Sequence, residues 1–248
     1  MVRLLRFDMM SPAMPNEQPG QPTGDPVHFF FREALLVGGE ATRLYLIRHA
    51  QSEGNTGEDL TTGDPDLTDV GRKQADRLGK RMKDARLDAL YASPLRRTQE
   101  TAFAIADATG LDVVPKADLR EVTLGQPDFD IRKLPIAEQR KIERQVLDDG
   151  TWDAFPGSEG SAAARERIQG VLDGIISAHP GQRVAAVVHA AFIQTYVSMV
   201  LGLDRDFVYY PFNASICSVR AHKDRRVIWR LNDVSHLADM PAGWGGIS

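Results

Sequence analysis

Compact apolar runs alternate with longer stretches of helical periodicity along most of the chain. The runs are short and β-prone, which predicts buried strands; they are residues 43–47, 88–92 and 183–188. In the longer stretches apolar residues recur every three or four positions, which predicts helices; these are residues 68–84, 95–110, 161–179 and 191–201. A closing antiparallel pair is expected from the two last β-prone segments, residues 214–220 and 226–231.

This order of elements predicts the fold class. Strands that alternate with helices favour a mostly parallel sheet with helices on both faces. We therefore expect an α/β protein, a three-layer α/β/α sandwich with a mostly parallel central sheet. The domain is expected over residues 41–238, with an insertion at 126–157 that covers the site as a lid, and residues 239–248 form a tail.

The first 40 residues differ in composition from the rest of the chain. Residues 11–26 are rich in Pro, Gly, Asn and Gln, and such a stretch buries too little apolar surface to offset its ordering entropy. We expect residues 1–40 to be a leader that is partly disordered. Residues 27–37 are strongly apolar. They pack on the edge of the domain, or on a second copy of the chain in a homodimer, or belong to a leader that precedes the true start codon.

Composition excludes several classes of protein. The 30 Lys and Arg against 34 Asp and Glu give a formal net charge of −4, which argues against a nucleic-acid partner. The single cysteine, Cys217, excludes an intrachain disulfide and any multi-cysteine metal site. No apolar stretch approaches the roughly 20 residues that span a bilayer, and the N-terminus lacks a signal-peptide pattern. We expect a cytoplasmic protein without a membrane partner.

Cationic and imidazole side chains follow the predicted strands. Arg48 and His49 come directly after the first strand, Arg96 and Arg97 after the second, and His189 after the central one. Ligands of open α/β sheets bind at the carboxyl ends of the strands, so these side chains are expected to converge at one edge.

The chemistry of these residue types points to phosphate. Arginine offers a rigid fork of donors that matches phosphate or carboxylate. A histidine in such a pocket can attack phosphorus through a ring nitrogen and form a covalent phospho-enzyme. The neighbouring cations would then offset the charge on the transferring phosphoryl group, a task that Mg²⁺ performs elsewhere.

The residues around these positions resemble a known family. The segment 46–55, Leu-Ile-Arg-His-Ala-Gln-Ser-Glu-Gly-Asn, resembles the signature of the histidine phosphatase superfamily, the phosphoglycerate-mutase-like enzymes. Four further segments resemble later blocks of the same family, in family order; they are residues 67–75, 93–102, 119–125 and 188–191. The resemblance spans about residues 43–232 and implies a phosphoglycerate-mutase-like fold.

The resemblance implies the catalytic roles. His49 would be the nucleophile that becomes phosphohistidine, while Arg48, Arg97 and His189 would hold the phosphoryl oxygens. Glu121 aligns with the general acid that protonates the leaving oxygen. Burial would have to raise its pKa for it to hold a proton near neutral pH. The alternative for Glu121 is a surface carboxylate paired with its neighbour in the sequence, Arg120.

The resemblance also suggests residues that bind the substrate; they are Asn55, Ser52, Ala190, Arg96 and Glu159. Arg96 is otherwise a solvated helix residue, and Glu159 a carboxylate favoured in the first turn of the following helix. Ala190 and Ala191 stand where the family commonly has glycine. A backbone N–H there can still donate to phosphate, but alanine would be strained at positive φ.

These observations predict a metal-independent phosphatase of the histidine acid type, without a cofactor, that hydrolyses a small phosphorylated substrate through phosphohistidine. A phosphoglycerate-mutase-type phosphotransferase and a catalytically decayed phospho-ligand binding protein are the alternatives. A metal-dependent hydrolase could instead use His49, His189 and Glu121. Against it, the chain has no short ligand motif such as His-Glu-x-x-His, and Arg48 would repel a cation.

Overall fold

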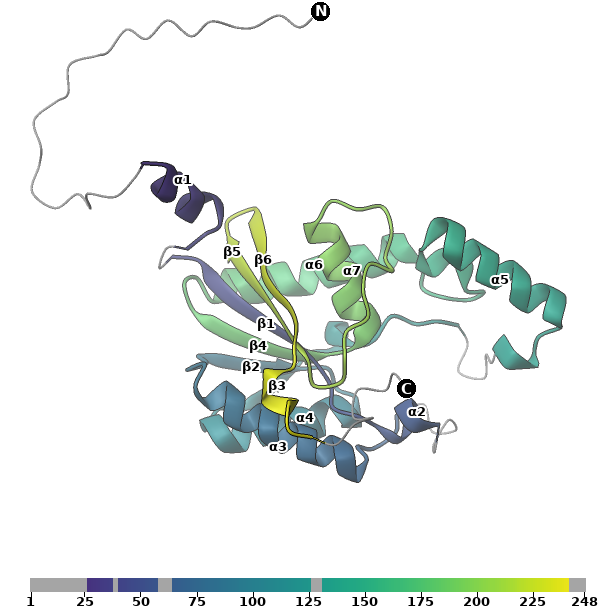
Figure 1. The fold of residues 1–248 in the computed structure, drawn as a ribbon, viewed down its shortest axis with the longest axis horizontal. Helices are drawn as coiled ribbons and strands as arrows, with labels where there is room; N and C mark the ends of the chain where they lie inside the picture. The colour runs from purple at the N-terminus through teal and green to yellow at the C-terminus, as the bar shows by residue number, and fades with distance from the viewer. Residues whose placement is uncertain (1–25, 38–39, 58–63, 126–130, 241–248) are drawn as a thin grey trace, which may run out of the picture.

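A computed structural model describes residues 26–37, 40–57, 64–125 and 131–240, and its described part contains a six-stranded sheet in the order β3-β2-β4-β1-β5-β6 (Figure 1). Strands β3, β2, β4 and β1 run parallel, and β5 and β6 complete the sheet antiparallel. The bounds are β1 (Thr42–Arg48), β2 (Ala89–Ala92), β3 (Val113–Pro115), β4 (Arg183–Val188), β5 (Ile216–His222) and β6 (Arg225–Asp233). The three-residue β3 was not predicted, because so short a strand carries no detectable periodicity.

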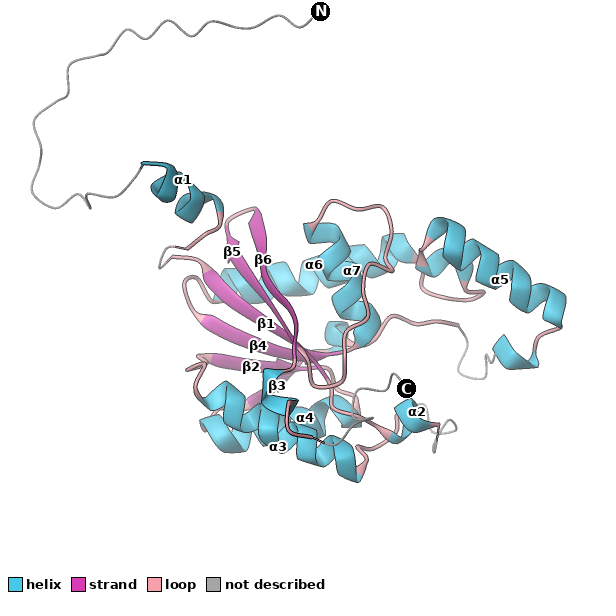
Figure 2. Ribbon diagram, in the orientation of Figure 1, coloured by secondary structure: helices cyan, strands magenta, loops and turns pink. Residues whose placement is uncertain are grey.

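Helices cover both faces of this sheet (Figures 1 and 2). Helices α3 (Asp69–Lys83) and α4 (Arg96–Thr109) lie on one face, and α6 (Ser161–Ala178) and α7 (Ala190–Val200) on the other. The predicted three-layer α/β/α sandwich is confirmed. A short helix that was not predicted, α2 (Glu53–Thr56), follows the loop after β1.

The central strand β4 explains why the layers hold together. Val184 to Val188 are all fully buried, as expected for a strand with helices on both sides. Val184, Ala186 and Val188 pack into the apolar cluster that includes α6 and α7. Ala185 and Val187 point to the opposite face and join the cluster of α3 and α4. The alternation of side chains along one strand therefore builds both layers of the core.

Helix α3 is placed against the loop that follows β1. Thr68 caps the helix by accepting a hydrogen bond from the Gly71 N–H at 3.0 Å. Gly71 approaches that loop so closely that a Cβ would lie 1.9 Å from the carbonyl oxygen of Gln51. The Gln74 side chain accepts a hydrogen bond from the Gln51 N–H at 2.8 Å. The helix thus fixes the backbone two residues beyond His49.

The predicted insertion contains a helix that extends away from the sheet, α5 (Ile136–Asp149) (Figure 1). Three short 3-10 helices flank this region in the sequence, η1 (Ala117–Leu119), which contacts α6, η2 (Ile131–Lys133), and η3 (Trp152–Ala154), which contacts α5. Ile142 is the buried residue of α5, while Ile136 and Leu147 are each 68% exposed. Residues 126–130 of the expected lid lie outside the described residues, and its role as a lid stays a prediction.

The apolar segment near the N-terminus forms a helix, α1 (Pro26–Ala34), beside the β5–β6 hairpin (Figure 1). Arg225 donates to the carbonyl oxygens of Glu33 at 2.9 Å and Ala34 at 2.7 Å. Leu36 is buried, whereas Phe30 and Phe31 are 69% and 60% exposed. The segment therefore contacts the domain edge in part, and the homodimer stays a prediction.

Other expectations for the chain ends fall outside the described part. Residues 1–25, where the disordered arm was expected, and 241–248 of the expected tail are not described.

Within the described residues, none of the helices has the length and apolar character needed to cross a membrane. The last described 3-10 helix, η4 (Ser235–Leu237), packs Leu237 into the α3–α4 cluster.

We predict that Gly71→Ala destabilises the fold by about 1–3 kcal/mol, because the added methyl group forces α3 away from the Gln51 carbonyl. Gly174→Ala, in α6, is the control: a Cβ there meets nothing within 4 Å, and alanine favours a helix. Urea unfolding monitored by circular dichroism measures both variants. Equal stability of Gly71→Ala and wild type would contradict the close approach.

Candidate active site

The polar residues predicted to converge do so at the carboxyl edge of β1, β4 and β2. Arg48 pairs with Val188 across β1 and β4, and Ala92 pairs with Val187 across β2 and β4. The residues that follow these strands are therefore neighbours. The rings of His49 and His189 lie edge to face, with centroids 5.4 Å apart. Two histidines separated by 140 positions in the sequence thus share one site.

The contacts of His49 determine where its proton lies. Its Nδ1 is 2.7 Å from the carbonyl oxygen of Ala50, which only accepts hydrogen bonds, so Nδ1 carries the proton. Its Nε2 is 3.3 Å from Nε of Arg97, which only donates, so Nε2 presents a lone pair. Burial lowers the pKa of His49 well below 6.5, and the charges of Arg48 and Arg97 lower it further. His49 is therefore a neutral imidazole at neutral pH.

The backbone of His49 is held from several sides. Its N–H donates to the Val188 carbonyl at 2.9 Å, which extends the β1–β4 pairing past the end of the strand. Its carbonyl oxygen accepts from the Ala214 N–H at 3.1 Å and from the Asn213 side chain at 3.1 Å. These bonds fix the backbone of His49, so its ring can move only by rotation about the side-chain bonds.

Arg48 and Arg97 place guanidinium groups close enough to His49 for both charges to lower its pKa. Arg48 is 4% exposed, donates to the Pro211 carbonyl at 2.7 Å and lies 5.3 Å from the ring centroid of Tyr210. Its Nε is buried and has no partner in the described structure. Arg97 lies at the start of α4, with Nη1 3.7 Å from a carboxylate oxygen of Asp64. The unsatisfied donor of Arg48 is available to an anion.

His189 is the second buried histidine and has one free ring nitrogen. Its Nε2 is 2.9 Å from the Ser93 hydroxyl, and its Nδ1 is buried without a partner in the described structure. Burial lowers its pKa well below 6.5, and nearby His49, Arg97 and Arg48 lower it further. A hydroxyl can donate or accept, so in the tautomer in which Ser93 donates to Nε2, Nδ1 carries the proton and can offer it to a ligand.

Glu121 lies at the N-terminus of α7. Its Oε1 accepts from the Val122 N–H at 2.9 Å and the Phe192 N–H at 3.0 Å, and Oε2 accepts from the Ala191 N–H at 3.2 Å. Burial raises the pKa of this carboxyl, against the lowering effect of these bonds and of Arg97. Glu121 is thus not the surface carboxylate considered as an alternative; Arg120 instead lies near the acids at positions 118 and 159.

Three of the five predicted substrate-binding residues lie in α2 and at the starts of α2 and α7; they are Ser52, Asn55 and Ala190. Ser52 is buried, and its backbone N–H donates to Oδ1 of Asn55 at 3.0 Å, which also accepts from Asn213 at 3.0 Å. The Asn55 amide nitrogen has no hydrogen-bond partner among the described residues, and its contact with a substrate stays a prediction. Ala190 begins α7, and neither it nor Ala191 has a positive φ, so the expected strain is absent.

The two remaining residues have protein partners of their own. Arg96 is exposed, and its guanidinium lies 3.3 Å from a carboxylate oxygen of Asp66. Glu159 accepts from Arg167 at 2.6 Å and from the Thr123 N–H at 3.0 Å. Although partial burial acts the other way, the Arg167 hydrogen bonds lower the pKa of Glu159. The contact of either residue with a substrate stays a prediction.

Sequence reasoning gave no role to three residues that hold the site together. Ser93 follows a strand and was visible as a polar residue, but its hydrogen bond to His189 depends on the β2–β4 register. Asn213, which bridges His49 and Asn55, precedes an antiparallel strand and carries no local signal. Tyr210 also lies on that segment, facing the Arg48 guanidinium.

Metal binding is not favoured by the arrangement of donors. Within the ranges that the structure describes, no three His, Cys, Asp or Glu side chains come together in a group that could hold a metal ion. Glu121 directs its oxygens to backbone N–H groups, and His49 has Arg48 and Arg97 as neighbours. In the described part of the chain, His49, His189 and Glu121 therefore do not form the ligand set that a metal-dependent hydrolase would need.

The fold and site define an α/β protein with arginines clustered around a buried, neutral histidine at the carboxyl edge of the sheet. The chain belongs to the histidine phosphatase superfamily (branch 1), whose match covers residues 44–234.

Its relatives include proteins with two kinds of name. It is 31% identical to phosphoserine phosphatase 1 of Hydrogenobacter thermophilus over 79% of this chain and 95% of that protein. It is 30% identical to the probable phosphoglycerate mutase GpmB of Erwinia tasmaniensis, again over 79% and 95%. Among solved structures, Bacillus stearothermophilus YhfR superposes with a TM-score of 0.70 at 25% identity, over 79% of this chain and all of that one.

The buried histidines predict how stability depends on pH. The unfolded chain binds protons near pH 6.5, whereas folded His49 does so only at much lower pH, so the free energy of unfolding falls as pH falls below 6.5. Each such histidine contributes a slope of at most about 1.4 kcal/mol per pH unit. We expect His49→Asn to flatten the pH dependence of urea unfolding between pH 6.5 and 5.

The control is His222→Asn, which changes a partly exposed histidine at the end of β5. This variant should keep the wild-type slope. If His49→Asn and wild type show the same slope, the burial of a neutral imidazole at position 49 is contradicted.

Proposed function

We propose that this chain is a phosphatase that hydrolyses small phosphomonoesters through a phosphohistidine at His49. The observation that carries the proposal is the protonation of His49: Nδ1 is committed to the Ala50 carbonyl, and the lone pair of Nε2 lies beside the Arg97 guanidinium. A neutral imidazole is a nucleophile through its unprotonated nitrogen, and the Arg97 cation that hydrogen-bonds to this nitrogen attracts the phosphoryl group that it attacks.

The surrounding donors fit a phosphoryl group. The Arg48 Nε and the His189 Nδ1 are buried donors that the described protein leaves unsatisfied, and Arg97 presents its fork next to them. An unsatisfied buried donor costs free energy, which an oxyanion recovers when it binds. We assign these three residues to the phosphoryl oxygens, with Asn55 and the backbone at Ala190 as further contacts.

In the first step, Nε2 of His49 bonds to phosphorus while the bond from phosphorus to the ester oxygen breaks. Protonated Glu121 gives its proton to that oxygen, which leaves as an alcohol. In the second step, Glu121 takes a proton from a water molecule, whose oxygen bonds to phosphorus as the P–N bond breaks. Inorganic phosphate leaves, and Glu121 is protonated again.

The pKa values set the pH range of this reaction and support an acid-type phosphatase. Activity falls at low pH when His49 becomes protonated, which occurs well below pH 6.5. Activity falls at high pH when Glu121 loses its proton, at a pKa that burial raises above 4.5. The reaction is therefore expected to be fastest on the acid side of neutrality.

Relatives named as phosphoserine phosphatase and probable phosphoglycerate mutase support a small phosphorylated acid as the substrate. We place the catalytic domain at residues 41–238 and its lid at 126–157. A mutase shares the first step, but returns the phosphoryl group to the substrate in place of water. Chromatography of the products from phosphoserine and 3-phosphoglycerate separates the two reactions, because only the phosphatase releases stoichiometric phosphate.

We predict that His49→Ala lowers the hydrolysis of 4-nitrophenyl phosphate at least about 1,000-fold in the presence of EDTA, because the variant lacks the imidazole that forms the P–N bond. Rapid acid-free quenching with a ³²P-labelled substrate should trap an acid-labile, alkali-stable phospho-enzyme in wild type alone. His222→Ala is the control and should keep full activity. Comparable activity of His49→Ala and wild type would overturn the role of His49. If wild type binds phosphate but hydrolyses no substrate, the protein is instead a catalytically decayed binding protein.

We predict that the loss of activity in Glu121→Gln depends strongly on the leaving group of the substrate. An alkyl phosphate leaves as a strongly basic alkoxide, so its hydrolysis should fall about 100–10,000-fold without a general acid. 4-Nitrophenolate needs no proton to leave, so the hydrolysis of 4-nitrophenyl phosphate should fall roughly 10-fold or less. The decrease of activity at high pH that wild type shows should be absent in this variant.

Glu166→Gln changes an exposed carboxylate on α6 and serves as the control. It should leave both substrates and the pH profile unchanged. Equal losses on alkyl and aryl phosphates in Glu121→Gln would show that Glu121 has a structural role at the N-terminus of α7 instead of a role as acid.

A further inference from the structure

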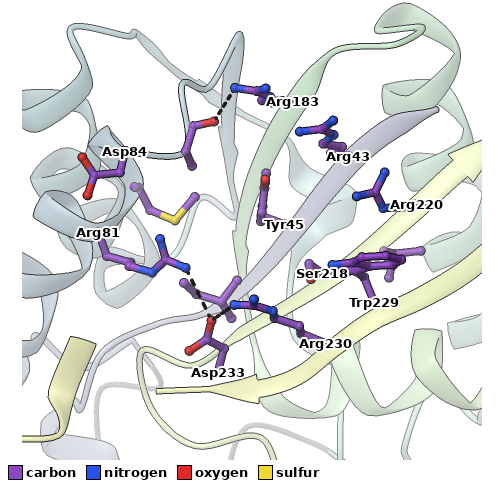
Figure 3. A pocket seen from close by; sticks show the side chains of 14 residues that line it. Arg43, Tyr45, Arg81, Asp84, Arg183, Ser218, Arg220, Trp229, Arg230 and Asp233 are labelled. Carbon is purple, nitrogen blue, oxygen red and sulfur yellow. Dashed lines mark hydrogen bonds and ion pairs between the residues drawn. The ribbon is translucent and has the colours of Figure 1, made fainter. Parts of the chain in front are cut away.

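A cavity lined by arginines lies on the α3 side of the sheet, and three of these arginines, Arg43, Arg183 and Arg220, lie at the end of the sheet opposite His49. It has a volume of about 340 Å³ and lies between the C-terminal end of α3 and strands β1, β5 and β6 (Figure 3). Arg43, at the start of β1, lines it, whereas Arg48 at the end of the same strand belongs to the candidate active site. Five residues of strand separate the two by roughly 16 Å.

Three of the arginines form a row across neighbouring strands. Arg43 of β1 is the direct cross-strand partner of Arg183 in β4 and of Arg220 in β5. All three line the cavity, and Figure 3 shows their guanidinium groups along one side of it. Like charges that lie directly opposite one another in a sheet repel. The row therefore destabilises the sheet unless an anion lies against it.

The guanidinium groups of this row have no acidic partner among the described residues. Arg183 donates to the Ala85 carbonyl at 3.1 Å, and Arg220 donates to the Leu36 carbonyl at 3.1 Å. Arg43 makes no side-chain hydrogen bond or ion pair in the described part of the chain. Burial lowers the pKa of Arg220, and the Arg43 charge lowers it further, as expected for uncompensated neighbours.

The carboxylates near the cavity do not compensate the row. Asp233 is shared by Arg230 at 3.1 Å and Arg81 at 3.7 Å, on the far side of the cavity (Figure 3). Asp88 accepts a hydrogen bond from the backbone N–H of Arg183 at 2.8 Å, not from its guanidinium. Asp84 lies on the α3 side. The lining holds five arginines against two aspartates, Asp84 and Asp233.

The walls of the cavity suit a small ligand. Tyr45 forms its floor beside Arg43, and Trp229 closes one side with its ring 4.1 Å from the Arg220 guanidinium carbon (Figure 3). This stacking fixes the Arg220 fork, so less side-chain freedom is lost when an anion binds. A volume of about 340 Å³ is at the lower end of the range for small-molecule sites.

We propose that this cavity is a second anion-binding site, separate from His49, which takes a small molecule with several negative charges on phosphate groups. Adjacent strands lie about 4.8 Å apart, so three neighbouring guanidinium groups can contact different oxygens of one polyphosphate. A singly charged anion neutralises only part of the row. The site does not depend on the proposed chemistry at His49, and the two can be tested independently.

The test uses the Trp229 indole as a local probe and sodium tripolyphosphate as the anion. The Trp229 indole N–H signal in a ¹H–¹⁵N spectrum is assigned by its loss in Trp229→Phe. Tripolyphosphate at low ionic strength should shift this signal saturably in wild type, and added NaCl should weaken the binding. Because the probe lies in the cavity, anion bound at the candidate active site does not produce this saturation curve.

Arg43→Gln should raise the dissociation constant at least about 10-fold, the loss of one charge-assisted hydrogen bond. Lys73→Gln removes the same charge from the exposed side of α3 and should change the constant less than about 2-fold. Arg43→Gln should also melt no lower than wild type at low salt, since Arg43 has no partner to lose.

Three results would overturn the proposal. The first is an unchanged Trp229 signal with tripolyphosphate. The second is equal weakening by Arg43→Gln and Lys73→Gln, which would indicate general charge attraction. The third is a Trp229 shift that follows protein concentration and dimer formation in sedimentation experiments, which would place a second copy of the chain over the arginine row.

Discussion

The site depends on the burial of a neutral imidazole beside two positive charges, those of Arg48 and Arg97. A histidine in water would be partly protonated near neutral pH, and its proton would exchange between both nitrogens. Here the Ala50 carbonyl holds the proton on Nδ1, and the guanidinium groups of Arg48 and Arg97 oppose a second one. The same two charges that keep His49 uncharged would attract an anion toward its unprotonated nitrogen, Nε2. In the proposed reaction, the nucleophile and the anion-binding groups therefore belong to one electrostatic arrangement.

That arrangement places demands on the rest of the fold. The cations stay beside the histidine only if β1 and β2 end at the same level, which their common neighbour β4 enforces through its register. Gly71 and Gln74 bring α3 against the loop after His49. Burial and the arginine charges act in the same direction on the pKa of His49, but they act in opposite directions on that of Glu121. Burial raises the pKa of Glu121, while hydrogen bonds from the N-terminus of α7 and the charge of Arg97 lower it.

The two halves of the sheet serve different purposes. The parallel half brings strand ends together and so collects polar side chains at one edge. The antiparallel pair β5–β6 closes the sheet and leaves a cavity beside the end of α3, where the arginine row is found. Strand β1 borders both halves, and it carries Arg43 at its start and Arg48 at its end. Two cationic regions of different character thus share one strand.

The sequence by itself determined the layers of the fold and the main site residues. Helical periodicity and short apolar runs are local properties, so α3, α4, α6, α7 and most strands could be placed within a few residues. Because parallel strands end at a common edge, the convergence of Arg48, His49, Arg97 and His189 followed from their positions after strands.

Only the tertiary structure decided the features that depend on register and burial. The three-residue β3 has no periodic signal, and the hydrogen bond from Ser93 to His189 joins residues 96 positions apart. The proton position on His49 requires the Ala50 carbonyl and Arg97 to be placed around the ring. The arginine row exists because β4, β1 and β5 pair in one particular register, and a shift of one residue would turn the side chains of the shifted strand to the opposite face. Contacts between distant segments set these features, and no local pattern encodes them.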